Sequence, residues 1–513
     1  MQKASTPEEA IGSMYAVGVD SGTQGTKVLV VDFDGNVRGR GYAAHALIQG
    51  LRPGESEQDP GVWLSALDAA LKKALNEANV PGSQIVCLGV SGQQHGMVAL
   101  DEKGHALRPA KLWNDTSTVE ETEILVDKLG GPEGTIQTLG IGLAVGYTAS
   151  KILWLKRHEP DNYRKLSVVP LPHNYINFAL TGRAHMEYGD ASGTGLMDIR
   201  TRTWQKKAIE AIDPELEEKL PPLSHPSEAV GFMQKEIARR YGMEKVLVAS
   251  GGGDNMMGAI GTGNVTPGVC TLSLGTSGTI YSYFESPFLD PDGEIAGFCD
   301  STGGWLPLLC TMNVTNTTEC FKAFLNISTS ELERLASKSP PGAEKLLFLP
   351  FLDGERVPVL PQASGVFFGL NRRNFRPSHL ARSIMEGTIL NLGYGFSRMK
   401  AMGLKPSEIR ATGGGSRSAL WLQIAANVFE TPVMRLVEQE AAAFGAAIQS
   451  IWNYELSRGN TISIQEITQE MVRLKEPMVD PHPETSALYR SLQERFNSLW
   501  NSLKQEFESH HAL

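Results

Sequence analysis

The sequence predicts an α/β protein built from two similar halves. Its 513 residues, of which 41% are hydrophobic, suffice for two or more buried cores. Short apolar runs typical of buried strands alternate with longer segments of helical periodicity, as in α/β folds. A glycine- and threonine-rich turn near residue 22 recurs near residue 275 between similar strands. This repeated motif indicates an internal duplication, and the two domains are predicted over 12–259 and 260–513.

The composition narrows the classes of function. A net charge of −10 argues against a nucleic-acid-binding protein, which normally carries a basic face. The sequence has no apolar run long enough to span a membrane, and residues 1–13 lack the apolar core of a signal peptide. The five cysteines form no Cys-x-x-Cys pair, which favours reduced thiols over a disulfide framework or a zinc site. We therefore expect a cytoplasmic enzyme that binds small molecules.

The first half opens on a strand–turn–strand predicted over 15–33. Asp20 ends the first strand, the turn covers 21–26, and Lys27 begins the second strand. Backbone N–H groups, the Thr23 hydroxyl and Lys27 at such a tip can cradle a phosphate. The turn is not a P-loop, because the dipeptide Gly-Lys occurs nowhere in the chain. A polar surface hairpin is the alternative interpretation.

Helices are expected between the motifs. Asp59 as N-cap and Pro60 at the first helical position predict a helix start, and an apolar stripe at helical spacing follows. The segments predicted as further helices are 149–158 and 171–180. Residues 130–145 are predicted to form a glycine-rich loop and residues 189–194 a loop of small and polar residues.

Polar and aromatic side chains follow the buried strand predicted over 85–90. Gln94 and His95 lie in the small-polar turn that follows it, and Trp113 lies further along the chain, before two polar residues. Ligands of open α/β sheets bind at the carboxyl ends of the strands. Amide and imidazole groups suit sugar hydroxyls, and an indole ring can stack on a sugar. A loop histidine with a purely structural hydrogen bond is the alternative for His95.

The segment 246–263 contains the strongest candidate for catalysis. An apolar run predicts a buried strand, Gly251–Gly253 follow it, and a helix of small residues begins near Asp254 and Asn255. Glycines let the backbone approach a ligand closely. A carboxylate at that helix start can act as a base beside a phosphate or a sugar. The alternative is a plain N-cap.

The second half repeats the first hairpin. Gly275 and Thr276 lie in a strand–turn–strand whose offset from Gly22 is 275 − 22 = 253 residues. At this offset the position of Asp20 is taken by Ser273, so the pair of hairpins supplies a single carboxylate. One carboxylate is what a Mg²⁺ held mainly by water and phosphate needs.

A second glycine run follows later in this half. It comes after a short apolar segment and before a predicted helix, and it comprises Gly413, Gly414 and Gly415, with Ser418 at the helix start.

Together these motifs resemble the FGGY carbohydrate kinases, members of the actin, hexokinase and heat-shock chaperone ATPase superfamily. The resemblance spans roughly residues 14–505 and rests on Asp20-Ser-Gly-Thr, Gly275-Thr-Ser-Gly, Gly252-Gly-Asp-Asn255 and Thr412-Gly-Gly-Gly-Ser416. It implies two actin-like (ribonuclease H-like) domains with a catalytic cleft between them. Ser91-Gly-Gln-Gln-His-Gly96 and Leu112-Trp-Asn-Asp115 are similar to the branch that converts D-xylulose to D-xylulose 5-phosphate. Gln94 departs from the Met common in that branch.

The resemblance also implies roles for residues. Asp254 would be the general base in a phosphoryl transfer from ATP, and Asp20 would anchor Mg²⁺. The residues implied to hold ATP are Gly22, Thr23, Lys27, Gly275, Thr276, Gly413, Gly414, Gly415 and Ser418. Those implied to bind the sugar are Gln94, His95, Trp113, Asp254 and Asn255. The expected binding partners are a small sugar and ATP. A homodimer is one candidate for the oligomeric state.

Two alternatives stay open. The first is a kinase of the same fold that acts on another polyol, ketose or sugar acid, such as glycerol, ribulose or gluconate. The second is a non-catalytic protein of the actin or chaperone type that ATP switches between states. Such a switch would not need Asp254 beside Gln94 and His95.

Overall fold

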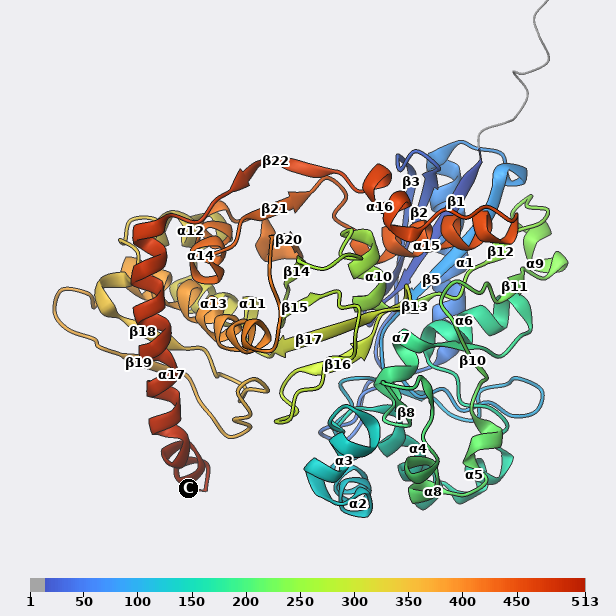
Figure 1. Ribbon diagram of the computed structural model, residues 1–513, viewed down its shortest axis with the longest axis horizontal. Coiled ribbons are helices and arrows are strands. Elements are labelled where there is room, and N and C mark those ends of the chain that lie inside the picture. Colours follow the sequence, from blue (N-terminus) through green and yellow to red (C-terminus); the bar gives the residue numbers. More distant parts are fainter. Residues whose placement is uncertain (1–13, 513) are drawn as a thin grey trace, which may run out of the picture. The chain divides into compact units, whose positions relative to one another are not determined.

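The computed structural model describes residues 14–512. The chain divides into two compact units (Figure 1). Unit 1 holds the chain up to Gly263, Cys299–Gly303 and Glu440–Val472, and unit 2 holds Asn264–Phe298, Gly304–Gln439 and the chain from Arg473. The predicted division is a single cut between residues 259 and 260, whereas the chain returns to unit 1 twice. The predicted domain start at residue 12 lies outside the described residues.

Unit 1 is organised around a mixed sheet of strand order β11-β12-β5-β1-β2-β3, in which β13 also pairs with β5. Its strands are β1 (Tyr15–Ser21), β2 (Gly25–Asp32), β3 (Val37–Ala44), β5 (Ile85–Gly92), β11 (Gly231–Phe232), β12 (Leu247–Val248) and β13 (Gly252–Gly253). Short pairings outside it involve β4 (Glu57–Gln58), β6 (Ala110–Lys111), β7 (Met186–Glu187), β8 (Met197–Asp198), β9 (Thr203–Trp204) and β10 (Leu223–Ser224). Side chains alternate along β1, so Val17 and Val19 join the core under α1 while Gly18 faces α15.

The helices of unit 1 cover this sheet and extend beyond it (Figure 1). They are α1 (Pro60–Ala78), α2 (Val119–Leu129), α3 (Gly131–Leu139), α4 (Thr148–His158), α5 (Pro160–Lys165), α6 (Pro172–Thr181), α7 (Tyr188–Ala191), α8 (Lys206–Ile212), α9 (Lys235–Arg239), α10 (Asp254–Gly261), α15 (Ala441–Ser457) and α16 (Ile464–Met471). The predicted start of α1 is confirmed, because the Asp59 side chain accepts the N–H of Gly61. The predicted helices α4 and α6 are also confirmed.

Unit 2 contains a second sheet, of order β16-β17-β15-β14-β20-β21-β22. Its strands are β14 (Val269–Leu274), β15 (Gly278–Ser282), β16 (Ala296–Cys299), β17 (Trp305–Thr311), β20 (Glu408–Thr412), β21 (Val433–Leu436) and β22 (Leu474–Val479), and β18 (Leu347–Leu349) pairs with β19 (Val366–Phe368). Its helices are α11 (Thr315–Leu325), α12 (Thr329–Ala336), α13 (Pro377–Ala401), α14 (Ala419–Phe429) and α17 (Pro483–His511). A large apolar core links β14, β20, α13, α14 and α17.

The two sheets confirm the predicted duplication. The path β3-β2-β1-β5-β12-β11 corresponds strand for strand to β17-β15-β14-β20-β21-β22. The strand directions also agree. Along each path, the first two neighbouring strand pairs are antiparallel, the next two are parallel and the last is antiparallel. Asp20 lies opposite Ser91 and Ser273 lies opposite Thr412, so the offset of 253 residues relates equivalent positions.

Two segments predicted as loops are helical. Residues 131–139 form α3, which buries Thr135 and Leu139 and begins with Pro132 in its first turn. Residues 188–191 form α7, because the Glu187 carboxylate accepts the N–H groups of Gly189 and Asp190. Glycines in the first segment and small polar residues in the second suggested loops, but burial and capping stabilise a helix.

Helices α10 and α15 of unit 1 cross in close contact. A Cβ on Gly261 would lie 1.8 Å from the Ala441 carbonyl oxygen, and a Cβ on Gly445 would lie 1.8 Å from that of Met257. Only glycine permits this approach, which fixes the helix that begins at Asp254. Among the described residues, no helix has the length and apolar character that crossing a membrane requires.

Candidate active site

Three predicted elements meet at one edge of the unit 1 sheet. Asp20 at the end of β1 pairs in parallel with Ser91 of β5, and Gly252 of β13 pairs with Ser91 from the other side. Because all three strands are parallel, their carboxyl ends lie together. Asp20, the loop that holds Gln94 and the start of α10 therefore converge, as the sequence predicted.

Asp254 is the first residue of α10, and Gly253 occupies the N-cap position. The Asp254 Oδ1 atom accepts the backbone N–H of Asn255 at 2.9 Å and the Asn255 side-chain amide at 3.2 Å. The same amide donates to Gln94 Oε1 at 2.8 Å. Three candidate sugar-binding residues thus form one hydrogen-bonded chain. Asp254 is not the plain N-cap of the alternative interpretation.

The surroundings of Asp254 favour a proton acceptor that works near neutral pH. Burial, and then the negative charge of Asp20, raise the pKa of Asp254 to about 7. Burial also raises the pKa of Asp20, against the opposing effects of the hydrogen bond from Ser91 Oγ at 3.0 Å and the charge of Lys27. A carboxylate with such a pKa gains basicity while still ionising at physiological pH.

Lys27 is ion-paired with Glu440, which lies directly before α15. Its Nζ donates to Glu440 Oε2 at 2.5 Å. Burial lowers the pKa of Lys27, but the hydrogen bond and charge of Glu440 outweigh this effect and leave the pKa raised. Lys27 therefore stays protonated beside Asp20. Its contact with a phosphate remains a prediction.

Trp113 and Thr23, predicted for sugar and nucleotide respectively, contact each other. The Trp113 indole donates to Thr23 Oγ1 at 3.0 Å, and that hydroxyl donates to Gln93 Oε1 at 3.2 Å. Gln58 Nε2 donates to the Thr23 carbonyl at 2.7 Å, which holds the hairpin tip. Sequence reasoning did not single out Gln58 or Gln93.

His95 adopts a left-handed backbone conformation with a φ of 61°. Its Nδ1 lies 2.8 Å from the Gly193 carbonyl and donates to it. The ring stacks on Tyr147, with centroids 4.6 Å apart. Tyr147 was missed because it follows a segment predicted to be a loop. It places an aromatic side chain beside the predicted sugar-binding residues.

A buried acidic group that the sequence prediction missed lies behind Gly253. Asp190 Oδ2 is 2.7 Å from His173 Nδ1, and both side chains are fully buried. Asp190 Oδ1 has no hydrogen-bond partner within the described part of the chain. A Cβ on Gly253 would lie 3.1 Å from this oxygen and 2.6 Å from Gln94 Cγ. Burial raises the pKa of Asp190 well above its usual range and lowers that of His173 to about 3.

In unit 2 the second hairpin presents backbone groups and hydroxyls. The carbonyls of Gly275 and Thr276 accept the N–H groups of Thr315 and Val314, which ties the hairpin tip to the start of α11. Thr276 itself is exposed. The tip is therefore held by main-chain bonds while its hydroxyl is accessible to a ligand.

The second glycine run directly follows β20. Gly413 has a φ of 80°, and a Cβ there would lie 2.7 Å from the Leu274 carbonyl, whereas a Cβ on Gly414 would meet nothing within 4 Å. Ser418 caps α14, since its Oγ accepts the N–H of Trp421 at 3.1 Å and donates to Glu333 at 2.8 Å. The exposed backbone at Gly414 is open to a ligand.

The acidic residues suit one kind of metal site. Among the described residues, no group of three or more His, Cys, Asp or Glu side chains could hold a metal ion. Mg²⁺ needs fewer protein ligands than this, because it commonly binds through one or two carboxylates, waters and substrate phosphates. Asp20 fits this pattern.

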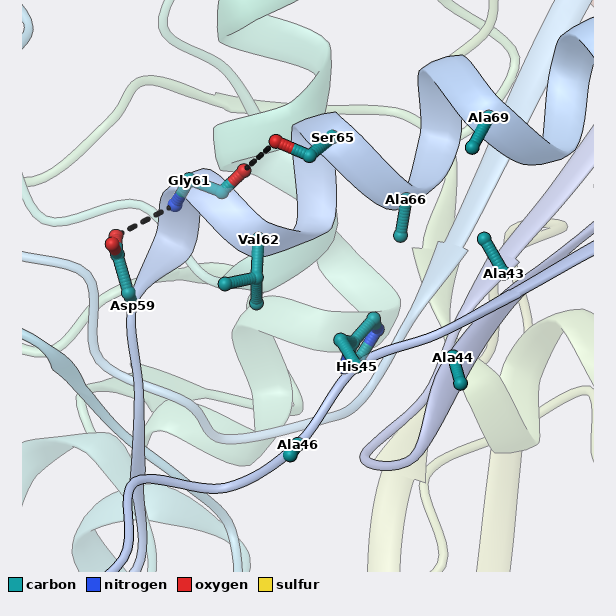
Figure 2. A pocket seen from close by; sticks show the side chains of 10 residues that line it. All are labelled: Ala43, Ala44, His45, Ala46, Asp59, Gly61, Val62, Ser65, Ala66 and Ala69. Atoms are coloured by element: carbon teal, nitrogen blue, oxygen red, sulfur yellow. Dashed lines mark hydrogen bonds between the residues drawn. The ribbon is translucent and has the colours of Figure 1, made fainter.

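A separate hollow of about 570 Å³ lies between α1 and the end of β3 (Figure 2). It is lined by Ala43, Ala44, His45, Ala46, Asp59, Gly61, Val62, Ser65, Ala66 and Ala69. None of these is a predicted site residue, and small apolar side chains dominate the lining. The hollow is therefore distinct from the group of residues around Asp254.

Comparison with known proteins identifies related chains. Residues 15–261 and 272–454 match the N-terminal and C-terminal domains of the FGGY family of carbohydrate kinases. A xylulose kinase of Haemophilus influenzae is 45% identical over 447 residues, which cover 86% of this chain and 90% of that protein. The crystal structure of a xyloylose kinase from Brucella ovis matches with a TM-score of 0.88 at 28% identity and covers 95% of this chain and 99% of its own. A gluconate kinase from Lactobacillus acidophilus, at 24% identity and a TM-score of 0.89, covers 97% of this chain and 100% of its own and shows likeness of fold alone.

Proposed function

Since this chain belongs to the FGGY family of carbohydrate kinases, we propose that it phosphorylates D-xylulose to D-xylulose 5-phosphate. The observation that carries this choice of sugar is the 45% identity to a xylulose kinase over 86% of the chain. Gln94 and His95 at the end of β5 support it, because they offer amide and imidazole groups to a ketose.

In the proposed reaction Asp254 is the general base. Its carboxylate accepts the proton of the attacking sugar hydroxyl while the oxygen bonds to the γ-phosphorus of ATP and ADP leaves. The Asn255 amide donates to the Asp254 carboxylate and to Gln94 Oε1, so it would orient the base relative to the sugar that Gln94 binds. Phosphoryl transfer passes through a loose transition state, so positioning contributes more than strong basicity.

The proposed nucleotide groups are backbone N–H groups and hydroxyls. Gly22, Thr23 and Lys27 in unit 1 and Gly275 and Thr276 in unit 2 would hold the phosphates, while Gly413, Gly414, Gly415 and Ser418 would lie against the adenosine. Mg²⁺ bound near Asp20 would neutralise phosphate charge. Trp113 would form a wall of the sugar site, and its bond to Thr23 would link the sugar and phosphate groups.

Another sugar or polyol is the second candidate, because Gln94 stands where Met is common in the xylulose-specific branch. The likeness to gluconate kinase concerns the fold and does not favour a sugar acid. A homodimer remains a proposal, tested by the mass of the protein in solution.

The test is a coupled ADP-release assay across D-xylulose, ribulose, glycerol, gluconate and fuculose. We expect D-xylulose to have the highest kcat/KM. A higher value for another compound would overturn the proposed sugar but not the kinase activity. Omission of Mg²⁺ should abolish turnover, and turnover that persists in excess chelator would contradict the proposed metal.

A further inference from the structure

A buried lysine of α4 joins two loops beside the proposed sugar-binding residues. Lys151 is fully buried. Its Nζ donates to the His95 carbonyl at 2.7 Å and to the Gly146 carbonyl at 2.5 Å. Both acceptors are main-chain oxygens, one in the loop after β5 and the other in the loop that leads into α4. One ammonium group thus fixes the relative position of loops that are distant in sequence.

The first of these loops carries His95 in an unusual conformation. Few residues other than glycine adopt its left-handed φ of 61°, and such a conformation persists only where the surroundings stabilise it. The His95 carbonyl accepts a second hydrogen bond, from Thr148 Oγ1 at 3.2 Å. The two donors on this one oxygen, Lys151 and Thr148, both belong to α4.

The second loop positions two aromatic residues. Tyr147 follows Gly146 directly and stacks on the His95 ring. A Cβ on Gly146 would lie 2.4 Å from the Trp113 carbonyl oxygen, so this loop also packs against the backbone of Trp113. A shift of the Gly146 carbonyl would therefore move Tyr147 and Trp113 as well as His95.

Stability alone does not account for this lysine. Within residues 14–512, no carboxylate forms an ion pair with Lys151, and the nearby Asp115 is paired with Lys111 at 3.2 Å. Burying an ammonium group without an acidic partner costs free energy, and burial lowers the pKa of Lys151 to about 7. An apolar side chain would fill the space at a lower cost, but it could not bind two carbonyl oxygens.

We propose that Lys151 is a positioning residue for the sugar site, where its side-chain amino group holds the backbone that presents His95, Tyr147 and Trp113 to the acceptor. This inference rests on the proposed function of the same site. Lys151 itself touches neither the sugar nor ATP. Its loss should weaken sugar binding while the nucleotide groups stay unchanged.

The test compares Lys151→Met with the wild-type full chain by steady-state kinetics. The acceptor is D-xylulose, or whichever sugar of the panel the wild type phosphorylates most efficiently. We expect the sugar KM to rise about tenfold, because small displacements of binding groups are costly, and the ATP KM to stay within about twofold. Lys219→Met is the matched control, since that ammonium also donates to a carbonyl, of Leu166 at 2.9 Å, and its sugar KM should change by less than about twofold.

Thr148→Val removes the other donor to the His95 carbonyl with little change of shape. It is expected to raise the sugar KM about threefold with an unchanged ATP KM, and it carries the test if Lys151→Met does not fold. A wild-type sugar KM in the folded variants, or an equal loss for sugar and ATP, would overturn the inference. A wild-type chain that phosphorylates no sugar of the panel would instead overturn the proposed function.

Discussion

The two sheets share one strand order, yet the ends of their equivalent strands differ in charge. In unit 1, β1 ends near Asp20, and Asp254 lies beside the end of β5. In unit 2 the place of Asp20 is taken by Ser273, and β20 runs into Gly413 and the glycines after it. The duplication thus accounts for the scaffold, while the side chains at the strand ends distinguish the two halves.

The difference matches the needs of two ligands. A hydroxyl group that must lose a proton needs a carboxylate nearby, whereas a polyphosphate is better held by N–H groups and hydroxyls. We therefore propose that the acidic end of the unit 1 sheet serves the sugar and the metal. The neutral end of the unit 2 sheet would serve the nucleotide.

The largest effect is expected at Asp254. Asp254→Asn keeps the size of the side chain but removes the base, so kcat should fall about 10³-fold, while the Kd for ATP changes less than about threefold. Turnover and nucleotide titration calorimetry measure the two quantities. The counterpart in unit 2 is Gly414→Leu. The added side chain meets open space, where we propose that the adenosine lies, so the ATP KM should rise while the sugar KM should not. Turnover of Asp254→Asn within tenfold of the wild type would contradict the role of the base.

Substituting each of the equivalent strand-end residues in turn sharpens the comparison. Asp20→Asn should lower kcat about 10²-fold and raise the Mg²⁺ concentration needed for half activity, because a metal-anchoring carboxylate is lost. Ser273→Ala at the equivalent position should change kcat less than about threefold. The measurement is a Mg²⁺ titration of the initial rate. Equal losses in the two variants would show that the two strand ends do not differ in function.

The pH dependence of catalysis follows from the raised pKa of Asp254. The base works as a carboxylate, so kcat/KM should fall about tenfold per unit as the pH drops below about 7. The charge of Asp20 contributes to this pKa, so the fall should begin at a lower pH in Asp20→Asn. Rates at saturating Mg²⁺ between about pH 5.5 and 8.5 test this. A profile that is flat down to pH 5.5 would rule out a titration near 7.

The smallest effect concerns stability. Burial raises the pKa of Asp190 above its unfolded value. The folded state therefore retains a proton that the unfolded state releases, and its stability decreases as the pH rises through the folded pKa. Asn cannot ionise, so the stability of Asp190→Asn relative to the wild type should increase as the pH rises from about 4 to about 8, with no gain near pH 4. Urea unfolding measures the difference. A gain that is larger at pH 4 would contradict the burial of this acid.

The sequence could predict which strand ends carry the candidate site residues because the signals are local. A glycine turn after an apolar run marks a strand end, and Asp254 at the following helix start needs no long-range information. Asp190 was missed since its helix α7 depends on the Glu187 carboxylate as a cap, which the glycine-rich composition conceals. Lys151 was missed because its two acceptors are backbone oxygens, which leave no pattern in a sequence.

The sequence by itself determined the duplicated α/β scaffold and the strand-end motifs, since period, spacing and turn chemistry are encoded residue by residue, and it carries the prediction of Asp254 as the base. Only the tertiary structure decided which groups surround that carboxylate. The desolvation that raises its pKa, the neighbouring Asp20 and Asp190, and the ammonium of Lys151 behind His95 all come from contacts between elements far apart in the chain. Such contacts depend on how the sheet and helices pack, because burial and proximity are properties of the fold and not of any single segment.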